Sequence, residues 1–161
     1  MNAKALPDDL CELLRGFPSV DSREQAFPFV TVDTGGYPHS ALLSRSELEP
    51  GPEGLSLFVV VAGRVTRANL KRTGAASLLA AHGTACHHAK LRMTRSVTER
   101  GLMGCVFTVT EYRHDDIGIA LQPMSFQTSE RLAQQENWQR STAMLSALSA
   151  AHPRQATFDD R

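Results

Sequence analysis

The sequence has few cysteines, few aromatic residues and no net charge. Its three cysteines are an odd number without paired spacing, which argues against a disulfide framework or a structural zinc site and fits a reducing compartment. Lysine plus arginine and aspartate plus glutamate number 17 each, so no general field draws the chain to nucleic acid or to an anionic membrane. No apolar run reaches the roughly 18 residues of a membrane helix, and the first residues lack the apolar core of a signal peptide. We therefore expect a cytoplasmic protein with neither a nucleic-acid nor a membrane partner.

The order of apolar and polar segments predicts a mainly β protein of the α+β class. The length of 161 residues suits one domain over 1–161, without repeats or a long linker. Helical patterns predict a short helix at 6–16 and a longer one at about 129–151. Alternation and β-branched residues predict strands at 28–33, 39–45, 55–62, 75–81, 91–98 and 105–112, with a weaker candidate at 117–121.

The strand predicted at 55–62 is apolar on both faces. Phe58 and Val60 alternate with Leu57, Val59 and Val61. A strand buried on both sides in an antiparallel protein suggests a barrel wall that is also covered from outside. In a chain of this size we expect a second subunit to be the cover, so the pattern predicts a homodimer.

A short basic helix predicted at 65–73 is the main candidate site. Thr66 is expected to cap its start, and Gly74 is expected to end it. Free backbone N–H groups at the start of a helix form a seat for a phosphate, and nearby cations strengthen it. The alternative is a helix face whose charges are simply solvated. The cations of this segment are Arg64, Arg67, Lys71 and Arg72.

Three segments, in this order, carry a resemblance to a known family. The segment 29–39 reads as a strand, a glycine-containing turn, and then proline and a polar residue. Thr66-Arg67-Ala68-Asn69-Leu70 has the pattern Thr-x-x-Asn-Leu. A strand at 107–112 is followed by Asp115 or Asp116 and by the segment 123–126. Together the three resemble the FMN-binding split-barrel family, the flavoproteins related to pyridoxamine 5′-phosphate oxidase.

The resemblance implies a six-stranded antiparallel split barrel over about 26–127, with flanking short helices and the C-terminal helix. It also implies a dimer with FMN between the two subunits. Thr66 and Asn69 would meet the phosphate of FMN, and Arg67 and Lys71 would balance its charge. The strand from His39 to Arg45 would run beneath the flavin ring. The other cofactor-binding residues expected on this basis are His39, Ser40, Ala41, Leu42, Ser44, Arg45, Val60 and Val61.

Two departures from the oxidase pattern separate cofactor binding from oxidation of vitamin B6. His39 and Ser44 stand where the oxidase has arginine and lysine, both of which touch its cofactor. The C-terminal part of the chain also lacks the Arg-Leu-His stretch that holds the vitamin phosphate. Cofactor binding is therefore the better supported of the two properties.

The other constellations in the sequence are weaker. Cys86-His87-His88 invites a metal or haem interpretation, but neighbouring side chains of an extended segment point to opposite faces, and no second ligand pair follows. We therefore predict no metal site there. Trp138 fits a core or subunit contact better than a platform for substrate. No nucleophile elbow, dinucleotide fingerprint or carboxylate pair stands out, so a cofactor would supply any chemistry and no catalytic residue is assigned.

Three functions remain open at this point, and with them the question whether the protein is an enzyme. The first is an FMN-dependent oxidoreductase that acts on an unidentified small molecule, with a nicotinamide as one conceivable reductant. The second is a non-catalytic flavin- or haem-binding protein that acts as a store, a sensor or a stress factor. The third is a split-barrel dimer without a cofactor.

Overall fold

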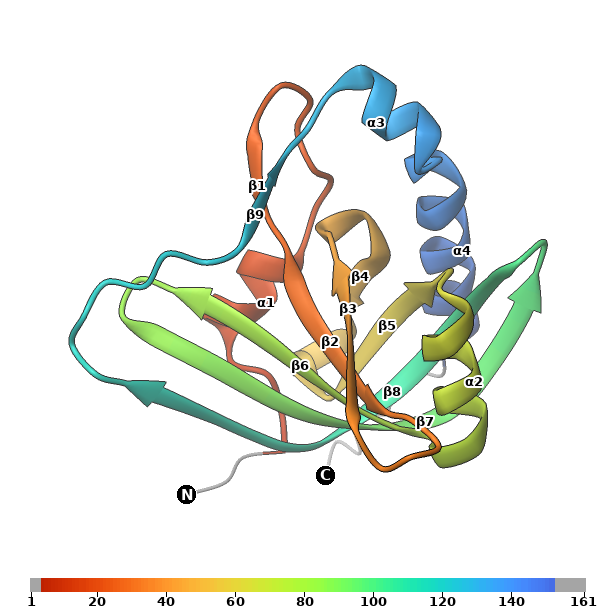
Figure 1. Ribbon diagram of the computed structural model, residues 1–161, viewed down its shortest axis with the longest axis horizontal. Coiled ribbons are helices and arrows are strands. Elements are labelled where there is room, and N and C mark those ends of the chain that lie inside the picture. The colour runs from red at the N-terminus through yellow and green to blue at the C-terminus, as the bar shows by residue number, and fades with distance from the viewer. Residues whose placement is uncertain (1–3, 153–161) are drawn as a thin grey trace, which may run out of the picture.

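A strongly curled antiparallel sheet forms the body of the protein (Figure 1). The computed structural model describes residues 4–152. The sheet has seven strands in the order β3-β2-β6-β7-β8-β5-β4, and a separate two-stranded ribbon of β1 and β9 projects from it. The strands of the sheet are β2 (Phe27–Val32), β3 (Pro38–Leu43), β4 (Leu48–Pro50), β5 (Ser56–Val61), β6 (Ala75–His82), β7 (Ala85–Glu99) and β8 (Leu102–Asp116). The ribbon pairs β1 (Arg23–Gln25) with β9 (Ser125–Gln127).

The main sheet has one strand more than the six that the sequence predicted. The additional strand is β4, a three-residue edge strand that ends at Pro50 and pairs with β5. Proline is tolerated at the edge of a sheet because one side of an edge strand needs no hydrogen-bond donor. The weak candidate at 117–121 is not a strand.

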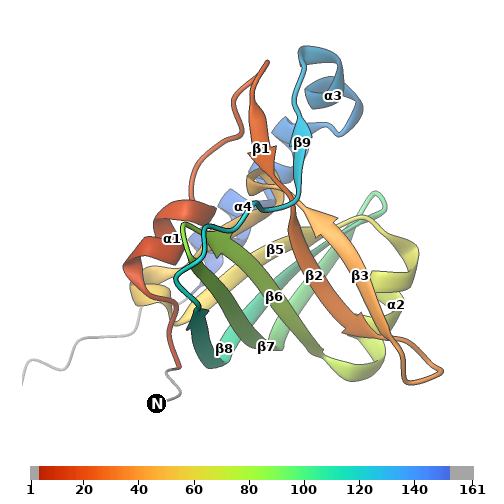
Figure 2. The same ribbon diagram turned by 60° about the vertical axis from the view of Figure 1, so that its left-hand side comes forward.

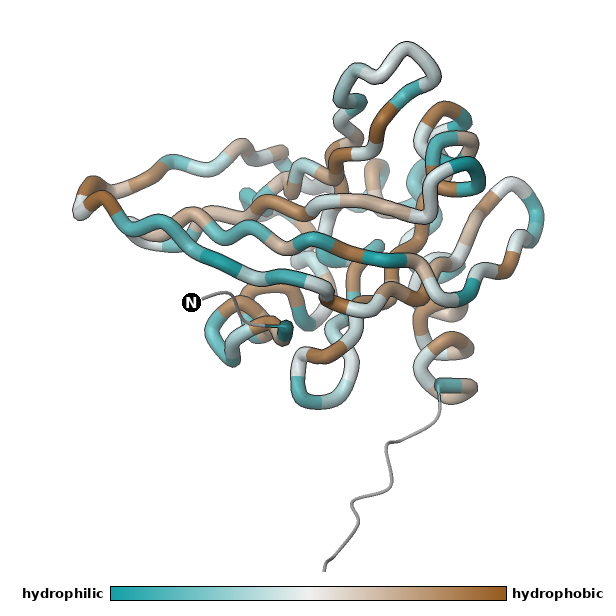
Figure 3. Tube along the Cα trace, turned by 90° about the horizontal axis from the view of Figure 1, so that it is seen from below, coloured by the Kyte–Doolittle hydropathy of each residue, from teal (hydrophilic) through white to brown (hydrophobic). Residues whose placement is uncertain are grey.

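The two longest strands extend well beyond their predicted ends. β7 and β8 are 15 residues each and pair along almost their whole length. Register shifts occur between Lys90 and Leu91 and between Met93 and Arg95. Such irregularities increase local twist and bend, which lets a long hairpin follow the curve of the barrel. Apolar and polar residues alternate through the middle of β7, over 89–94, and Figure 3 shows hydrophobic and hydrophilic residues interspersed along the chain.

The main hydrophobic core fills the inside of the curled sheet. From β5 it includes Leu57, Val59 and Val61, each at most 1% exposed. Phe29 of β2 and Phe107 of β8 meet edge to face, with ring centroids 5.8 Å apart. The helix α1 (Asp8–Leu14) closes one side of this core through Leu10 and Leu14. The helix predicted at 6–16 therefore forms and packs as its apolar spacing indicated.

The outer face of β5 is covered by a helix of the same chain. The second core cluster joins Phe58 and Val60 of β5 to Met144 and Leu148 of the helix α4 (Trp138–Ala151). At Gly104 of β8 an added Cβ would lie 2.8 Å from the Met144 sulfur, so the helix needs a residue without a side chain there. The two apolar faces of 55–62 are confirmed. The interpretation that a second subunit covers one of them is wrong, because α4 already does.

The helix predicted at 129–151 is broken into two. α3 (Glu130–Gln135) and α4 are separated at Asn137, whose φ of 48° lies in the left-handed region. Asparagine tolerates this conformation, and its side chain also accepts a hydrogen bond from the Arg140 amide at 3.3 Å. The residue therefore ends one helix and caps the next. Within residues 4–152 no helix combines the length and the apolar character needed to cross a membrane.

Candidate functional site

The basic helix is α2 (Arg64–Thr73), which lies across one end of the barrel (Figure 2). It begins one residue earlier than predicted, with Gly63 as its N-cap, so the expected capping role of Thr66 is wrong. Apolar residues precede Gly63, and no side chain caps the helix. Its end is as predicted, because Gly74 adopts a φ of 64° and its amide donates to the Leu70 carbonyl at 2.8 Å.

Asn69 anchors α2 to the barrel. Its side chain is buried, and its Nδ2 donates to Oγ1 of Thr31 at 3.0 Å. Its Oδ1 accepts from Nη1 of Arg72 at 3.2 Å, and Nη2 of Arg72 donates to the carbonyl of Val32. Both ends of the Asn69 amide are thus occupied within the protein. Asn69 and Arg72 hold the helix in place, which leaves a phosphate to be met by the residues before them.

The start of α2 has unused hydrogen-bonding groups. The first amides of a helix have no partner within it, and the Arg67 amide is the first to find one, the Gly63 carbonyl at 3.0 Å. Thr66 is 1% exposed, yet its Oγ1 has no hydrogen-bond partner among the described residues. Nε of Arg67 is also buried without a partner there. Unpaired buried polar atoms are costly, so this end of the helix is suited to an oxygen-rich ligand.

Gly63 keeps space open beside the hydroxyl of Thr66. Its φ of −61° and ψ of 129° are available to any residue, so backbone conformation does not require glycine. A Cβ at this position would lie 3.7 Å from Oγ1 of Thr66 and would meet nothing closer outside its chain neighbours. The missing side chain therefore allows a ligand to approach the first turn closely.

The charge at this helix is of one sign. Its first turn contains no acidic residue, and Arg64 and Lys71 are exposed while Arg67 is half-buried. Arg67 and Lys71 are one helical turn apart and can act on the same anion. The positive end of the helix dipole adds to the attraction at the first turn.

Of the predicted residues on β3, His39 lies nearest to α2. His39 pairs with Thr31, so both side chains project from the same face, the face that meets Asn69. Ala41 shares this face, and Ser40 and Leu42 are exposed on the other. Of the residues predicted on this strand, His39 lies closest in register to the anchor of the helix.

Ser44 and Arg45 lie beyond the end of β3, and their side chains stabilise the local structure. Ser44 caps a short 3-10 helix, η1 (Arg45–Glu47), and its amide donates to Oε2 of Glu47 at 2.8 Å. Arg45 forms an ion pair with Glu24, with Nη2 and Oε1 2.6 Å apart. Burial opposes ionisation of Glu24, but hydrogen bonds from Arg45 and from the Ser19 amide outweigh it and lower the pKa of Glu24.

Val60 and Val61 are each 1% exposed in opposite core clusters, Val60 beneath α4 and Val61 inside the barrel. Their side chains are thus committed to packing. The structure groups Thr66, Arg67, Asn69 and Lys71 on α2, with His39 on the neighbouring strand. The remaining predicted residues lie elsewhere.

A cavity of about 470 Å³ lies at the other end of β3, a feature that sequence reasoning missed. Its walls come from the end of β3, from η1, from β9 and from the α3–α4 junction. Glu47 lines it, and burial raises the pKa of this carboxyl from 4.5 to about 7; the Ser44 amide opposes the shift and Glu136 adds to it. The spacing Ser44-x-x-Glu47 is a capping-box pattern and was the available signal in the sequence. Trp138 also lines the cavity while it is only 5% exposed.

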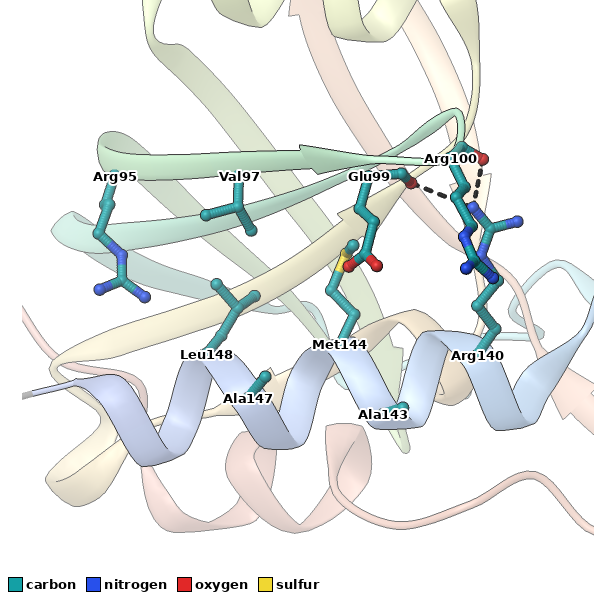
Figure 4. A pocket seen from close by; sticks show the side chains of 9 residues that line it. All are labelled: Arg95, Val97, Glu99, Arg100, Arg140, Ala143, Met144, Ala147 and Leu148. Carbon is teal, nitrogen blue, oxygen red and sulfur yellow. Dashed lines mark hydrogen bonds between the residues drawn. The ribbon is translucent and has the colours of Figure 1, made fainter.

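A second cavity, of about 290 Å³, lies between α4 and β7 (Figure 4). Met144 and Leu148 of α4 form its apolar floor. Arg140 reaches from the helix to the tip of the β7–β8 hairpin, where Nη2 donates to the Glu99 carbonyl at 3.0 Å and to the Arg100 carbonyl. This arginine therefore joins helix and hairpin and is not free to bind a ligand.

The Cys86-His87-His88 segment lies within β7. His87 is 2% exposed, and its Nδ1 is 2.6 Å from the Tyr112 hydroxyl, while burial lowers its pKa. Cys86 and His88 share the other face, where Sγ and Nε2 are 3.6 Å apart, and Nε2 of His88 is 3.5 Å from Oδ2 of Asp115. The opposite orientation of the two histidines is as predicted. Across residues 4–152, no three metal-ligating side chains are grouped so as to hold an ion.

No protein-family model and no curated protein sequence matches this chain. Solved structures do resemble it. A protein assigned as a flavin reductase with a split-barrel domain, from Shewanella frigidimarina, has a TM-score of 0.51 at 10% identity, over 68% of this chain and 81% of that one. The flavin reductase of the styrene monooxygenase of Pseudomonas putida has a TM-score of 0.50 at 9% identity, over 67% and 89%.

A conserved hypothetical protein of Mycobacterium tuberculosis has a TM-score of 0.50 at 12% identity, over 76% of this chain and 94% of that one. At these identities the likeness is one of fold. The chain has the split-barrel fold that flavin reductases also use.

Proposed function

We propose that the protein binds FMN, with the phosphate at the start of α2, and uses it in an oxidoreductase reaction on a small molecule. The observation that carries the proposal is the first turn of α2. It combines free amides, the buried and unpartnered Thr66 hydroxyl, and Arg67 beside them. A split-barrel fold with flavin reductases among its neighbours supports the same assignment.

The residues of the first turn fit a phosphate dianion. The amides of Arg64, Val65 and Thr66 point along the helix axis toward the ligand, and the Thr66 hydroxyl can donate one more hydrogen bond. Arg67 offers a guanidinium that binds phosphate oxygens in pairs, and Lys71 adds a point charge. Asn69, in this proposal, acts on the phosphate only through the position of the helix.

A bound flavin would supply hydride transfer, with a nicotinamide as the reductant of choice. The contribution of the chain is to bind and orient. Because α2 itself contains no carboxylate and no histidine, we assign no proton transfer to the side chains of this helix. The competing function is a flavin-binding store or sensor, which would use the same seat without turnover.

The absorption spectrum of the purified protein tests the assignment. We expect the two absorption bands of an oxidised flavin, and their loss when NADH or NADPH is added without oxygen. Flavin bands that no nicotinamide bleaches would favour the non-catalytic binder. A single intense haem band, or no chromophore together with no uptake of added FMN, would contradict the proposal.

We also propose that the protein is a homodimer, now on different grounds from those of the sequence. The β2–β3 hairpin leaves Val32 45% exposed and Tyr37, in its turn, 71% exposed, and β3 is an edge strand of the sheet. Exposed apolar surface beside a free strand edge is suited to self-association. Such a contact would bring the edge strand β3 of one subunit against its copy.

A further inference from the structure

We propose that the cavity at the end of β3 is a second ligand site, which takes a small aromatic molecule with a protonated nitrogen. The cavity lies away from the start of α2, where we place the phosphate. α2 is anchored near the Pro38–His39 end of β3, through Thr31 and Val32, whereas the cavity is lined by residues 42–44 at the opposite end.

The walls of the cavity favour a ligand whose main part is apolar. Its lining includes Leu42 and Met124, which remain 53% and 57% exposed, as well as the ring of Phe126. Trp138 forms part of the wall and is held in place by Phe17, with ring centroids 6.2 Å apart. Aromatic and thioether groups of this kind contact planar ligands well. A volume of about 470 Å³ is within the range of small-molecule sites.

The charge of the cavity selects a cation. Glu47 and Glu136 both line it, and none of its lining residues within 4–152 is basic. Oε2 of Glu47 accepts from the Ser44 amide at 2.8 Å, and Oε1 has no hydrogen-bond partner among the described residues. The nearby Arg45 is engaged by Glu24 at 2.6 Å and so does not neutralise the pair. A protonated nitrogen would supply the missing partner and offset the repulsion between the two carboxylates.

The two acidic groups also predict how binding depends on pH. Burial, with a smaller contribution from Glu136, raises the pKa of Glu47 to about 7. Glu47 is therefore mostly neutral at pH 6 and mostly ionised at pH 8. A cationic ligand should bind about tenfold more tightly at pH 8 than at pH 6, whereas a neutral ligand of the same shape should show no such change.

Trp138 gives the experiment a direct signal, because it is the sole tryptophan of the chain. Its fluorescence would be followed while the full-length protein, without added flavin, is titrated with benzylamine, benzyl alcohol and benzoate. We expect saturable changes in the order benzylamine, benzyl alcohol, benzoate, with at least about a fivefold preference for the amine at pH 8. Equal affinity for amine and alcohol, or no saturable change, would overturn the proposal.

Two variants assign the effect to the cavity. Glu47→Gln keeps the shape of the side chain and should abolish both the preference for the amine and its pH dependence. Glu49→Gln is the matched control, since Glu49 is half-buried two residues away and does not line the cavity; it should leave both unchanged. An amine preference that survives in Glu47→Gln would contradict the assignment.

Met124→Lys keeps the test valid if Glu47→Gln fails to fold, because Met124 is exposed at the rim. Its added cation should weaken benzylamine binding at least about fivefold and affect benzyl alcohol less. Unchanged binding of benzylamine would count against the site. The outcome is independent of the flavin spectrum, so either proposal can fail alone.

Discussion

Single residues decide what the start of α2 can bind. Gly63 leaves the space beside the Thr66 hydroxyl free of a side chain, and Asn69, which was expected to meet the phosphate, is instead tied to Thr31 and Arg72. The pattern Thr-x-x-Asn places both residues on the inner side of one helix face, one turn apart. Which of them meets a ligand depends on β2, whose register no local pattern reveals.

Gly63→Ala tests directly whether a ligand uses this space. The backbone angles at this position suit alanine, so the free energy of unfolding should change by less than about 1 kcal/mol. The added methyl group would lie 3.7 Å from Oγ1 of Thr66, in the space where we place a phosphate oxygen. We expect FMN affinity to fall at least about tenfold. Urea unfolding and an FMN titration measure the two effects, and Gly35→Ala, in the exposed hairpin turn, should not change FMN affinity.

The carboxyl of Glu47 should make stability depend on pH. Because its pKa is raised from 4.5 to about 7 in the folded protein, the folded state binds its proton more tightly than the unfolded state. The stabilisation of the folded state by this protonated carboxyl is fully present below pH 4.5 and is lost as the pH rises through about 7. The loss amounts to about 2–3 kcal/mol. The urea midpoints of the wild type and of Glu47→Gln would be measured between pH 5 and 8. They should converge at low pH, and at high pH the variant should have the higher midpoint. Parallel curves would show that Glu47 is not buried in this way.

At the scale of elements, α4 is what allows β5 to be apolar on both faces. The sequence correctly predicted the strand and its two buried faces, because the residues on both sides of 57–61 are apolar. It could not tell which surface covers the outer face, since a helix of the same chain and a second subunit present similar apolar side chains. The contact between β8 and α4 depends on Gly104, whose role becomes visible only when the two elements meet.

Leu148→Ala measures the strength of this cover. Leu148 is 1% exposed against Phe58, Val60 and Val106, so truncation should cost about 2–5 kcal/mol of unfolding free energy. Ser149→Ala, on the exposed side of the same helix, should change it by less than about 0.5 kcal/mol. A loss of under about 1 kcal/mol for Leu148→Ala would mean that α4 packs only loosely on the barrel.

Local signals also explain which elements were predicted and which were not. Long alternating strands and α2 follow from periodicity and from Gly74, whereas β1, β4 and β9 have three residues each and carry no period. The break at Asn137 has a local cause, a left-handed asparagine, but nothing in the surrounding helical composition marks it. The cavity that holds Glu47 was missed because it brings residues 26 and 42–47 together with residues 124–138, which are distant along the chain.

For the whole molecule, the proposed homodimer is testable in solution. Light scattering should give the mass of two chains of 17.6 kDa each. Val32→Asp would bury a charge in the proposed contact and should shift the protein toward the monomer. Val20→Asp, at a residue that is 46% exposed and lies outside the hairpin, is the matched control and should remain dimeric. A wild type of one chain's mass at micromolar concentration would contradict the dimer.

The central claim for the whole molecule is that α2 receives the phosphate of a flavin, and the affinity difference between FMN and riboflavin tests it most directly. Riboflavin lacks the phosphate, so apoprotein should bind FMN at least about a hundredfold more tightly. The double variant Arg67→Ala, Lys71→Ala should remove most of this difference by weakening FMN alone, because charge-assisted hydrogen bonds contribute about 1.5–3 kcal/mol each. The double variant Lys90→Ala, Arg113→Ala removes the same charge from the distant β7–β8 face and should leave the difference intact. Equal dissociation constants of FMN and riboflavin in the wild type, or an FMN constant that Arg67→Ala, Lys71→Ala leaves unchanged, would contradict the account.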